Sequence, residues 1–247
     1  MEGMEYFYEL FRSIPRGGPG DNNSTRKAFS YLKKLPAEPL MLDLGCGHGV
    51  QTLELARLSI GTIIALDTYQ PFLDILMRNA RAEGFENRII PKHQSMLEME
   101  FDDGTFDVIW SEGALYFMGF QQGLATCNRL LKNKGYVAVT EAVLLKHNLP
   151  KPLQEFWDTY YPVIMDIPSN IALIKKERLK LLAHFTLPES SWVDNYYTPI
   201  EKSITTLKKK YHDNTIALQT FETLEEEIRM YKNYSEYYGY EFFIMQK

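Results

Sequence analysis

The sequence predicts an α/β fold in which helices cover both faces of a mostly parallel sheet, giving a three-layer sandwich. Short apolar runs alternate with amphipathic helical segments from about residue 40 to 145, a pattern typical of parallel strands joined by helices. A glycine cluster directly follows the first apolar run. With 247 residues, of which 45% are hydrophobic, the chain is long enough for one well-packed domain.

The first elements follow from apolar runs and from the residues that stop them. The first apolar run ends at the glycine cluster, and the second ends in an acidic residue. Proline suits the first turn of a helix and glycine suits its end. The expected elements are a strand at 39–44, a helix at 51–58, a strand at 63–66 and a helix from Pro71 to Gly84.

The second part of the alternating region predicts three more strands. The last of them is apolar over a length typical of the centre of a sheet. The expected elements are a weaker strand at 88–91, a strand at 106–110, a helix from Phe120 through Leu131 that is closed by Lys134-Gly135, and a strand at 136–145.

After Pro150 the character of the sequence changes. Residues 151–170 are rich in aromatic residues and contain three prolines, which indicates an inserted cap rather than further sheet. The remaining elements are expected to be helices at 171–183, 200–212 and 215–237 and a terminal strand at 240–246. No internal repeat or linker divides the chain, so we expect a single domain over 1–247.

Charge and composition exclude several classes of partner. The formal net charge of −5 disfavours a nucleic-acid-binding surface, and the basic run 208–210 is interpreted as a solvated helix face. Cys46 and Cys127 form neither a disulfide framework nor a zinc-ligand spacing, so no metal site is predicted. The amino terminus is unlike a signal peptide, and no apolar run approaches the roughly 18 residues of a membrane span. We therefore expect a cytoplasmic monomer or homodimer without nucleic-acid or membrane partners.

The strongest local signal is the segment Asp43-Leu44-Gly45-Cys46-Gly47-His48-Gly49. Its glycines permit positive φ angles and let a ligand approach the main chain. The helix that follows presents free amide groups and a partial positive charge at its first turn. Such a loop holds a dinucleotide or another nucleoside cofactor. A dinucleotide site requires glycine three positions after Gly47, where this chain has Val50, so the other nucleoside is favoured.

This segment resembles motif I of the class I S-adenosylmethionine-dependent methyltransferases. The resemblance implies a Rossmann-like fold with a seven-stranded sheet, a terminal antiparallel strand and an inserted helical and aromatic cap. It implies that the glycine loop holds the methionine part of S-adenosyl-L-methionine, which leaves as S-adenosyl-L-homocysteine. The acid that ends the second strand, Asp67, is expected to bind both ribose hydroxyls through charge-assisted hydrogen bonds.

The resemblance also implies adenine contacts after the second and third strands, from Thr68 or Tyr69 and from Ser95 and Met96. The acid usual in the second of these loops is absent, and Met96 suits a core position equally well. The complete expected set of cofactor-binding residues is Asp43, Gly45, Cys46, Gly47, Gly49, Asp67, Thr68, Ser95, Met96, Ser111, Arg16 and Gly18.

Catalytic candidates lie where the fourth and fifth strands end. Ligands of open parallel sheets gather beyond the carboxyl ends of the strands, and Glu112 and Glu141 point to that edge. We expect Glu112, Glu141 and Tyr116 to be catalytic. Each acid is expected to act as a base or to pair with a cationic amine acceptor; the open alternative is that it caps a helix or pairs with Arg16 or Arg26.

Further segments resemble one subgroup of bacterial and archaeal methyltransferases over nearly all of residues 6–247. The matching stretches include Gly18-Pro19-Gly20, Ile109–Tyr116, Phe156-Trp157, Leu187–Ser190 and Tyr238-Gly239. The resemblance implies an amino-terminal segment at 1–35 that covers the cofactor, with Arg16–Gly20 as a gate, a cofactor-binding core at 37–145 and a cap at 146–200. Trp157, Tyr161 and Trp192 are implied to wall an acceptor pocket.

Three classes of function remain open. The leading hypothesis is methyl transfer to a nitrogen, oxygen or carbon atom of a small molecule. A protein or RNA methyltransferase of the same fold is disfavoured by the acidic charge and by the expected cap. A cofactor-binding regulator without catalysis is the third class, because folds of this type do not guarantee chemistry. An NAD-dependent oxidoreductase is disfavoured by Val50.

Overall fold

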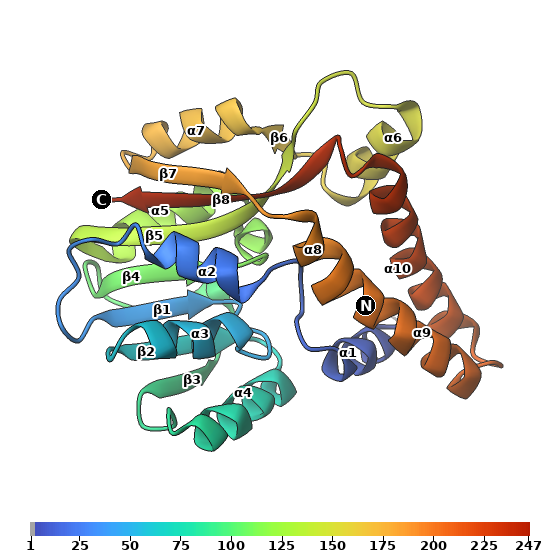
Figure 1. Ribbon diagram of the computed structural model, residues 1–247, viewed down its shortest axis with the longest axis horizontal. Helices are drawn as coiled ribbons and strands as arrows, with labels where there is room; N and C mark the ends of the chain where they lie inside the picture. The colour runs from blue at the N-terminus through green and yellow to red at the C-terminus, as the bar shows by residue number, and fades with distance from the viewer. Residues whose placement is uncertain (1–2) are drawn as a thin grey trace.

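The computed structural model describes residues 3–247; Met1 and Glu2, where the expected amino-terminal segment begins, lie outside this range. Eight strands of the described chain form one sheet in the order β3-β2-β1-β4-β5-β8-β7, and β6 pairs with β5 (Figure 1). The strands are β1 (Leu40–Leu44), β2 (Thr62–Asp67), β3 (Ile89–His93), β4 (Phe106–Ser111), β5 (Leu131–Leu144), β6 (Met165–Asp166), β7 (Lys180–Thr186) and β8 (Tyr238–Gln246). The pairs from β3 through β5 are parallel, whereas β8 is antiparallel to both of its neighbours.

Helices cover both faces of this sheet because side chains alternate across each strand. Met41 and Leu42 of β1 belong to different hydrophobic clusters, and so do Val108 and Ile109 of β4. α2, α3 and α4 cover one face, and α5 and α7 cover the other. Their bounds are α2 (Asn22–Phe29), α3 (Val50–Leu58), α4 (Gln70–Glu83), α5 (Phe120–Leu130) and α7 (Ile167–Lys176).

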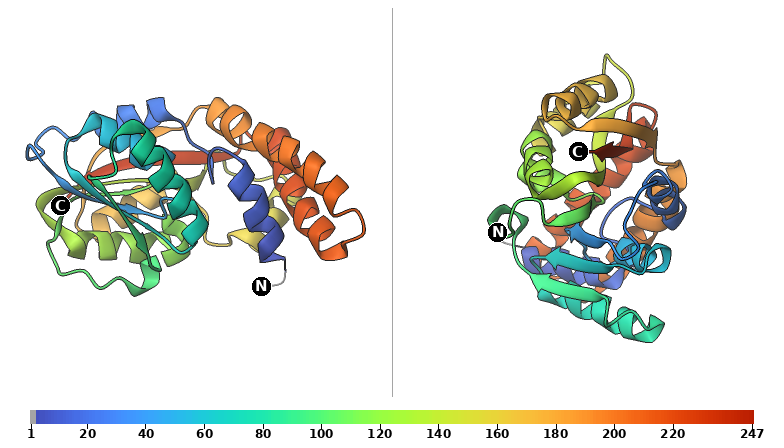
Figure 2. Two further views of the ribbon diagram at one scale, coloured as in Figure 1. Left: turned by 90° about the horizontal axis from the view of Figure 1, so that it is seen from below. Right: turned by 90° about the vertical axis from the view of Figure 1, so that its left-hand side faces the viewer.

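A separate group of helices lies beyond the carboxyl ends of the parallel strands (Figures 1 and 2). It consists of α1 (Met4–Ser13), α6 (Lys151–Tyr160), α8 (Glu189–Trp192), α9 (Thr198–Lys210) and α10 (Thr215–Tyr234). These helices share a third hydrophobic cluster, in which Trp157, Trp192 and Phe221 are buried. We call this group the helical cap. None of the helices within residues 3–247 combines the length and apolar content needed to cross a membrane.

The predicted α/β class, the mostly parallel sheet and the antiparallel terminal strand are confirmed. The helix expected at 171–183 is wrong in its second half: α7 ends at Lys176, Arg178 adopts a φ of 59°, and the chain returns as β7. Residues of β7 alternate poorly in hydrophobicity, and their pairing with β8 decides their conformation.

A second helix also ends earlier than its pattern predicts. The helix expected to close at Lys134-Gly135 stops at Leu130, because Leu131 turns to extended backbone and pairs with Phe106 of β4. The range expected as the cap, 146–200, supplies α6 and α8 to the helical cap but also α7 and β7 to the sheet layers. Much of the helical cap instead comes from the last third of the chain.

Candidate active site

The glycine loop joins β1 to α3 at the carboxyl edge of the sheet. Gly45, Gly47 and Gly49 have φ angles of 69°, 52° and 77°, which glycine adopts without steric cost. The amides of Gly45 and Cys46 both donate to the carbonyl of Leu66, at 2.9 and 3.0 Å, and this ties the loop to the end of β2. A Cβ atom at Gly47 would meet no described atom within 4 Å. The loop therefore leaves space beside its backbone for a ligand.

Asp43 lies beneath this loop with a fully buried side chain. Its Oδ2 accepts a hydrogen bond from Thr52 Oγ1 at 2.5 Å, whereas its Oδ1 has no partner among residues 3–247. Burial raises the pKa of the Asp43 carboxyl to about 7. A buried carboxylate oxygen without a partner is costly, so this position suits a ligand that supplies an ammonium group.

Asp67 ends β2 on the other side of the loop. Its Oδ2 accepts from the amide of Gly47 and its Oδ1 from the amide of Tyr69, both at 2.9 Å. Burial raises the pKa of this carboxyl as well. An ionised carboxylate offers about four acceptor positions, so each oxygen retains capacity for one hydroxyl donor. The main chain thus holds the carboxylate in place for a ligand with two neighbouring hydroxyls.

The residues expected near adenine lie at the same edge. Ser95 Oγ accepts from the amide of Leu97 and so caps a short 3-10 helix. Met96 is buried in a hydrophobic cluster of the sheet. This agrees with the alternative interpretation that Met96 fills a core position. The carbonyl of Thr68 lies 2.8 Å from His93 Nε2. Tyr69 stacks on Tyr8 of α1, with ring centroids 3.9 Å apart, so the first helix covers this part of the edge.

Two further residues expected to bind cofactor have structural contacts of their own. Ser111 is fully buried, and its hydroxyl donates to the carbonyl of Leu44 at 3.0 Å, which links β4 to β1. The thiol of Cys46 is buried, and burial raises its pKa well above the usual range. Both side chains face protein, which leaves only their backbone atoms for a ligand of the loop.

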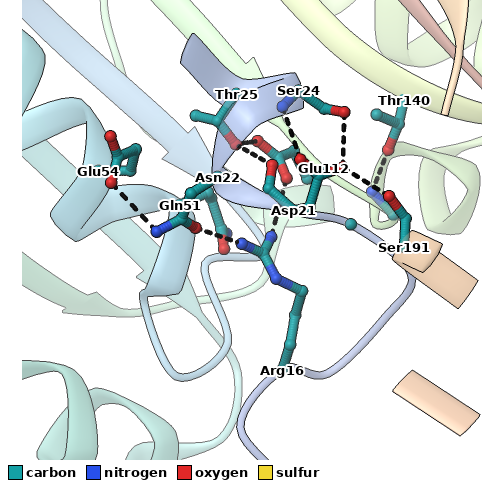
Figure 3. Close-up of polar contacts among 12 residues, drawn as sticks. Arg16, Asp21, Asn22, Ser24, Thr25, Gln51, Glu54, Glu112, Thr140 and Ser191 are labelled. Carbon is teal, nitrogen blue, oxygen red and sulfur yellow. Dashed lines mark hydrogen bonds and ion pairs between the residues drawn. The ribbon is translucent and has the colours of Figure 1, made fainter. Parts of the chain in front are cut away.

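Glu112 is held by three protein donors, and Figure 3 shows two of them, Arg16 and Thr25. Its Oε2 pairs with Arg16 Nη1 at 3.0 Å, and its Oε1 accepts from Thr25 Oγ1 at 2.7 Å and from Trp110 Nε1 at 2.9 Å. Arg16 and Glu112 expose only 9% and 4% of their side chains. We call Arg16, Thr25 and Glu112 the N-terminal latch. The sequence left open that Glu112 pairs with Arg16 instead of acting in catalysis, and the structure shows this pairing.

An aromatic cavity of about 240 Å³ lies between the sheet edge and the helical cap. Trp157, Tyr161 and Trp192, the expected pocket walls, all line it, and so does Tyr116. Gly18, expected at the cofactor, lines this cavity too, together with its neighbours in the gate segment. The structure therefore brings the gate, the end of β4 and the cap aromatics together around one space.

Comparison with known proteins finds similarity to methyltransferases. A family model described as a methyltransferase domain matches residues 41–135. An uncharacterized methyltransferase of Bacillus subtilis is 27% identical over 93% of each chain, and a demethylmenaquinone methyltransferase of Lactobacillus johnsonii is 26% identical over 68% of each chain. The crystal structure of a SAM-dependent methyltransferase from Geobacter sulfurreducens with S-adenosyl-L-homocysteine has a TM-score of 0.84 and 18% identity, covering 98% of this chain and 97% of that one. Residues 41–135 therefore match a methyltransferase domain, and nearly the whole chain shares the fold of this SAM-dependent methyltransferase.

Two solved structures of this fold contain S-adenosyl-L-homocysteine, the product formed from S-adenosyl-L-methionine. The glycine loop fits it on two observations: the free Oδ1 of Asp43 matches an ammonium group, and the open space beside Gly47 admits a ligand to the backbone. Asp67 offers its remaining acceptor positions to the two hydroxyls of a ribose. The loop and its two carboxylates thus suit a nucleoside that carries an amino-acid group.

Glu141 lies behind the wall of the aromatic cavity. It is 3% exposed and accepts a 2.6 Å hydrogen bond from the hydroxyl of Tyr161, which lines the cavity. Burial raises the pKa of Glu141 to about 7. Because that pKa lies near neutrality, Glu141 gains or loses a proton at small cost at physiological pH.

Sequence reasoning missed Glu227, which lines the aromatic cavity from α10. Its side chain is partly exposed, and burial raises the pKa of its carboxyl to about 7. The run Glu225-Glu226-Glu227 has the pattern of a solvated helix face. A signal was nevertheless present: Glu227 lies three residues after Leu224 and four before Tyr231, two buried residues of the same helix face.

Proposed function

We propose that this methyltransferase methylates a nitrogen, oxygen or carbon atom of a small molecule held in the aromatic cavity. The observation that carries the proposal is the small cavity, which the gate segment, the end of β4 and the helical cap line together. Its volume of about 240 Å³ is smaller than the roughly 300–1,000 Å³ of pockets for drug-sized ligands. A protein or RNA acceptor needs an opening that admits a chain, which such a cavity disfavours.

The residues of the chain supply orientation and proton transfer. The cofactor, when bound, supplies a methyl group activated by a sulfonium charge. The glycine loop, Asp43 and Asp67 hold it, and the N-terminal latch closes residues 3–25 over the sheet edge. Glu112 acts as a positioning residue, because its oxygens are engaged by Arg16, Thr25 and Trp110. Tyr161 relays a proton from the acceptor to Glu141 through their 2.6 Å hydrogen bond.

Thermal unfolding with and without cofactor tests the first half of this proposal. A ligand at 100 times its dissociation constant stabilises a protein by about 2.7 kcal/mol, which raises Tm by roughly 5–10 °C for a chain of this length. We expect this rise with S-adenosyl-L-methionine and S-adenosyl-L-homocysteine and none with NAD. Asp67→Asn should lose the rise, because an amide cannot accept from both ribose hydroxyls and keep both backbone bonds.

Asp74→Asn is the matched control, since Asp74 lies on α4 nearby and pairs only with Gln70 within the described chain. It should keep the full rise. A rise with NAD alone would contradict the assignment. Transfer of a labelled methyl group to a low-molecular-weight metabolite fraction tests the second half. Labelling confined to the protein or RNA fraction would overturn the small-molecule acceptor.

A further inference from the structure

The aromatic cavity contains an acidic group and no basic residue to pair with it. Ten of the seventeen lining residues are aromatic, and Glu227 is the acidic residue among them. No lysine, arginine or histidine belongs to this lining within the described part of the chain. Glu227 receives one hydrogen bond, from the hydroxyl of Tyr197 at 3.0 Å.

The carboxylate of Glu227 therefore has no partner of opposite charge among the described residues that line the cavity. A buried charge is normally paired, and one that lacks a partner shifts its pKa toward the neutral form. The raised pKa of Glu227 agrees with this, and its physical cause is burial. A cationic guest would supply the missing charge and favour ionised Glu227. A neutral guest would leave the Glu227 carboxylate without a counter-charge.

The ring walls suit the same kind of guest. Trp157 and Tyr238 meet at 84° with centroids 4.9 Å apart, and Trp192 and Tyr240 meet at 68° with centroids 4.8 Å apart. Since ten aromatic residues line one cavity of about 240 Å³, a cation inside it lies close to several rings. A cation over an aromatic face gains about 0.5–2 kcal/mol, and more when desolvated.

Two polar atoms of lining residues have unused hydrogen-bonding capacity. Trp157 Nε1 and Tyr238 Oη are buried without a partner in residues 3–247. Both residues line the cavity. The indole nitrogen can only donate, and the phenol can donate or accept. They match an oxygen atom carried by the guest.

We propose that the methyl acceptor is a small aliphatic amine with an oxygen substituent, bound as its ammonium ion against Glu227 and the ring faces. The inference rests on the proposed function and names the acceptor class. The ammonium gives one proton through the Tyr161 hydroxyl to Glu141, while Glu227 remains the counter-charge. The freed nitrogen lone pair then forms the new N–C bond while the C–S bond breaks and leaves its electron pair on sulfur. The product is an ammonium ion with one more methyl group.

A pair of matched probes tests this assignment without turnover. Choline and its neutral isostere 3,3-dimethylbutan-1-ol have almost the same shape and share the hydroxyl, and neither offers a free amine to methylate. Binding is measured calorimetrically at pH 8 in protein saturated with S-adenosyl-L-homocysteine. We expect choline to bind at least about tenfold more tightly than the isostere.

Two substitutions then test whether Glu227 causes the tighter binding of choline. Glu227→Gln should reduce the difference between the two probes to about twofold or less, because the amide carries no charge. Glu222→Gln is the matched control: Glu222 lies on the same helix but is exposed, and it should keep the full preference. Circular dichroism verifies that each variant is folded.

The outcomes separate the two proposals. Absence of S-adenosyl-L-homocysteine binding in the first titration would overturn the proposed function. Binding of S-adenosyl-L-homocysteine with equal affinity for choline and the isostere would overturn the amine inference alone. Retention of the preference in folded Glu227→Gln would remove Glu227 as the counter-charge. The comparison in the unsubstituted protein decides the inference even where Glu227→Gln does not fold.

Discussion

Within the described chain, Asp43 has one unpaired oxygen beneath the glycine loop. The residue is fully buried, Thr52 satisfies one of its oxygens, and its pKa is raised to about 7. Because the folded-state pKa lies above the unfolded value of 3.8, the native state binds more protons between about pH 4 and 7. Stability therefore falls as pH rises through this window. An ammonium group at Oδ1 would offset this loss, because it favours the ionised carboxylate.

We predict that S-adenosyl-L-homocysteine binds about tenfold more weakly at pH 6 than at pH 8. At pH 6 Asp43 must lose its proton before it pairs with the ammonium group, and a pKa of about 7 makes that cost about one factor of ten. Isothermal titration across this range measures the effect. Asp43→Asn should bind weakly and with little pH dependence. A pH-independent affinity in the unsubstituted protein would contradict this role of Asp43.

The first two helices show how elements remote in sequence form the site. α1 packs into the hydrophobic cluster of the helical cap, and Asp21 at the start of α2 accepts from Ser191 Oγ at 2.5 Å. The N-terminal latch attaches the segment between these helices to the end of β4 (Figure 3). Since the gate residues 17–19 also line the aromatic cavity, a loss of the latch affects the acceptor site.

We predict that Arg16→Met destabilises the protein by about 3–5 kcal/mol, because it leaves buried Glu112 without its counter-charge. Urea unfolding measures this change, and hydrogen exchange should become faster in α2. Lys151→Met is the matched control, since the Lys151–Glu155 pair is exposed, and such pairs contribute less than about 1 kcal/mol. A loss for Arg16→Met no larger than for Lys151→Met would show that the latch does not hold the segment.

At the scale of the whole molecule, the sheet and the cofactor loop were predictable from sequence because their signals are local. The run before Gly45, the acid at residue 67 and the turn at Gly84 each fix one element boundary. The antiparallel β7 was not predictable, because only its pairing with β8 makes residues 180–186 a strand.

The acceptor site was predictable only in part. Trp157, Tyr161 and Trp192 were identified through resemblance, and they line the cavity. Glu227 was not identified, because its helix reaches the cavity only through the packing of the helical cap. The role of Glu112 depended on Arg16, which lies 96 residues away in sequence. Contacts of this kind arise from tertiary structure and leave little trace in local patterns.

A crystal structure of the protein with S-adenosyl-L-homocysteine is the most direct test of the central claim that the glycine loop and Asp67 hold one nucleoside beside the aromatic cavity. We predict ribose hydroxyls within hydrogen-bonding distance of the Asp67 carboxylate, the amino group at Asp43 Oδ1, and the sulfur atom directed toward the cavity. A nucleoside bound at another face of the sheet, or with its sulfur directed away from Glu227 and Tyr161, would contradict the account.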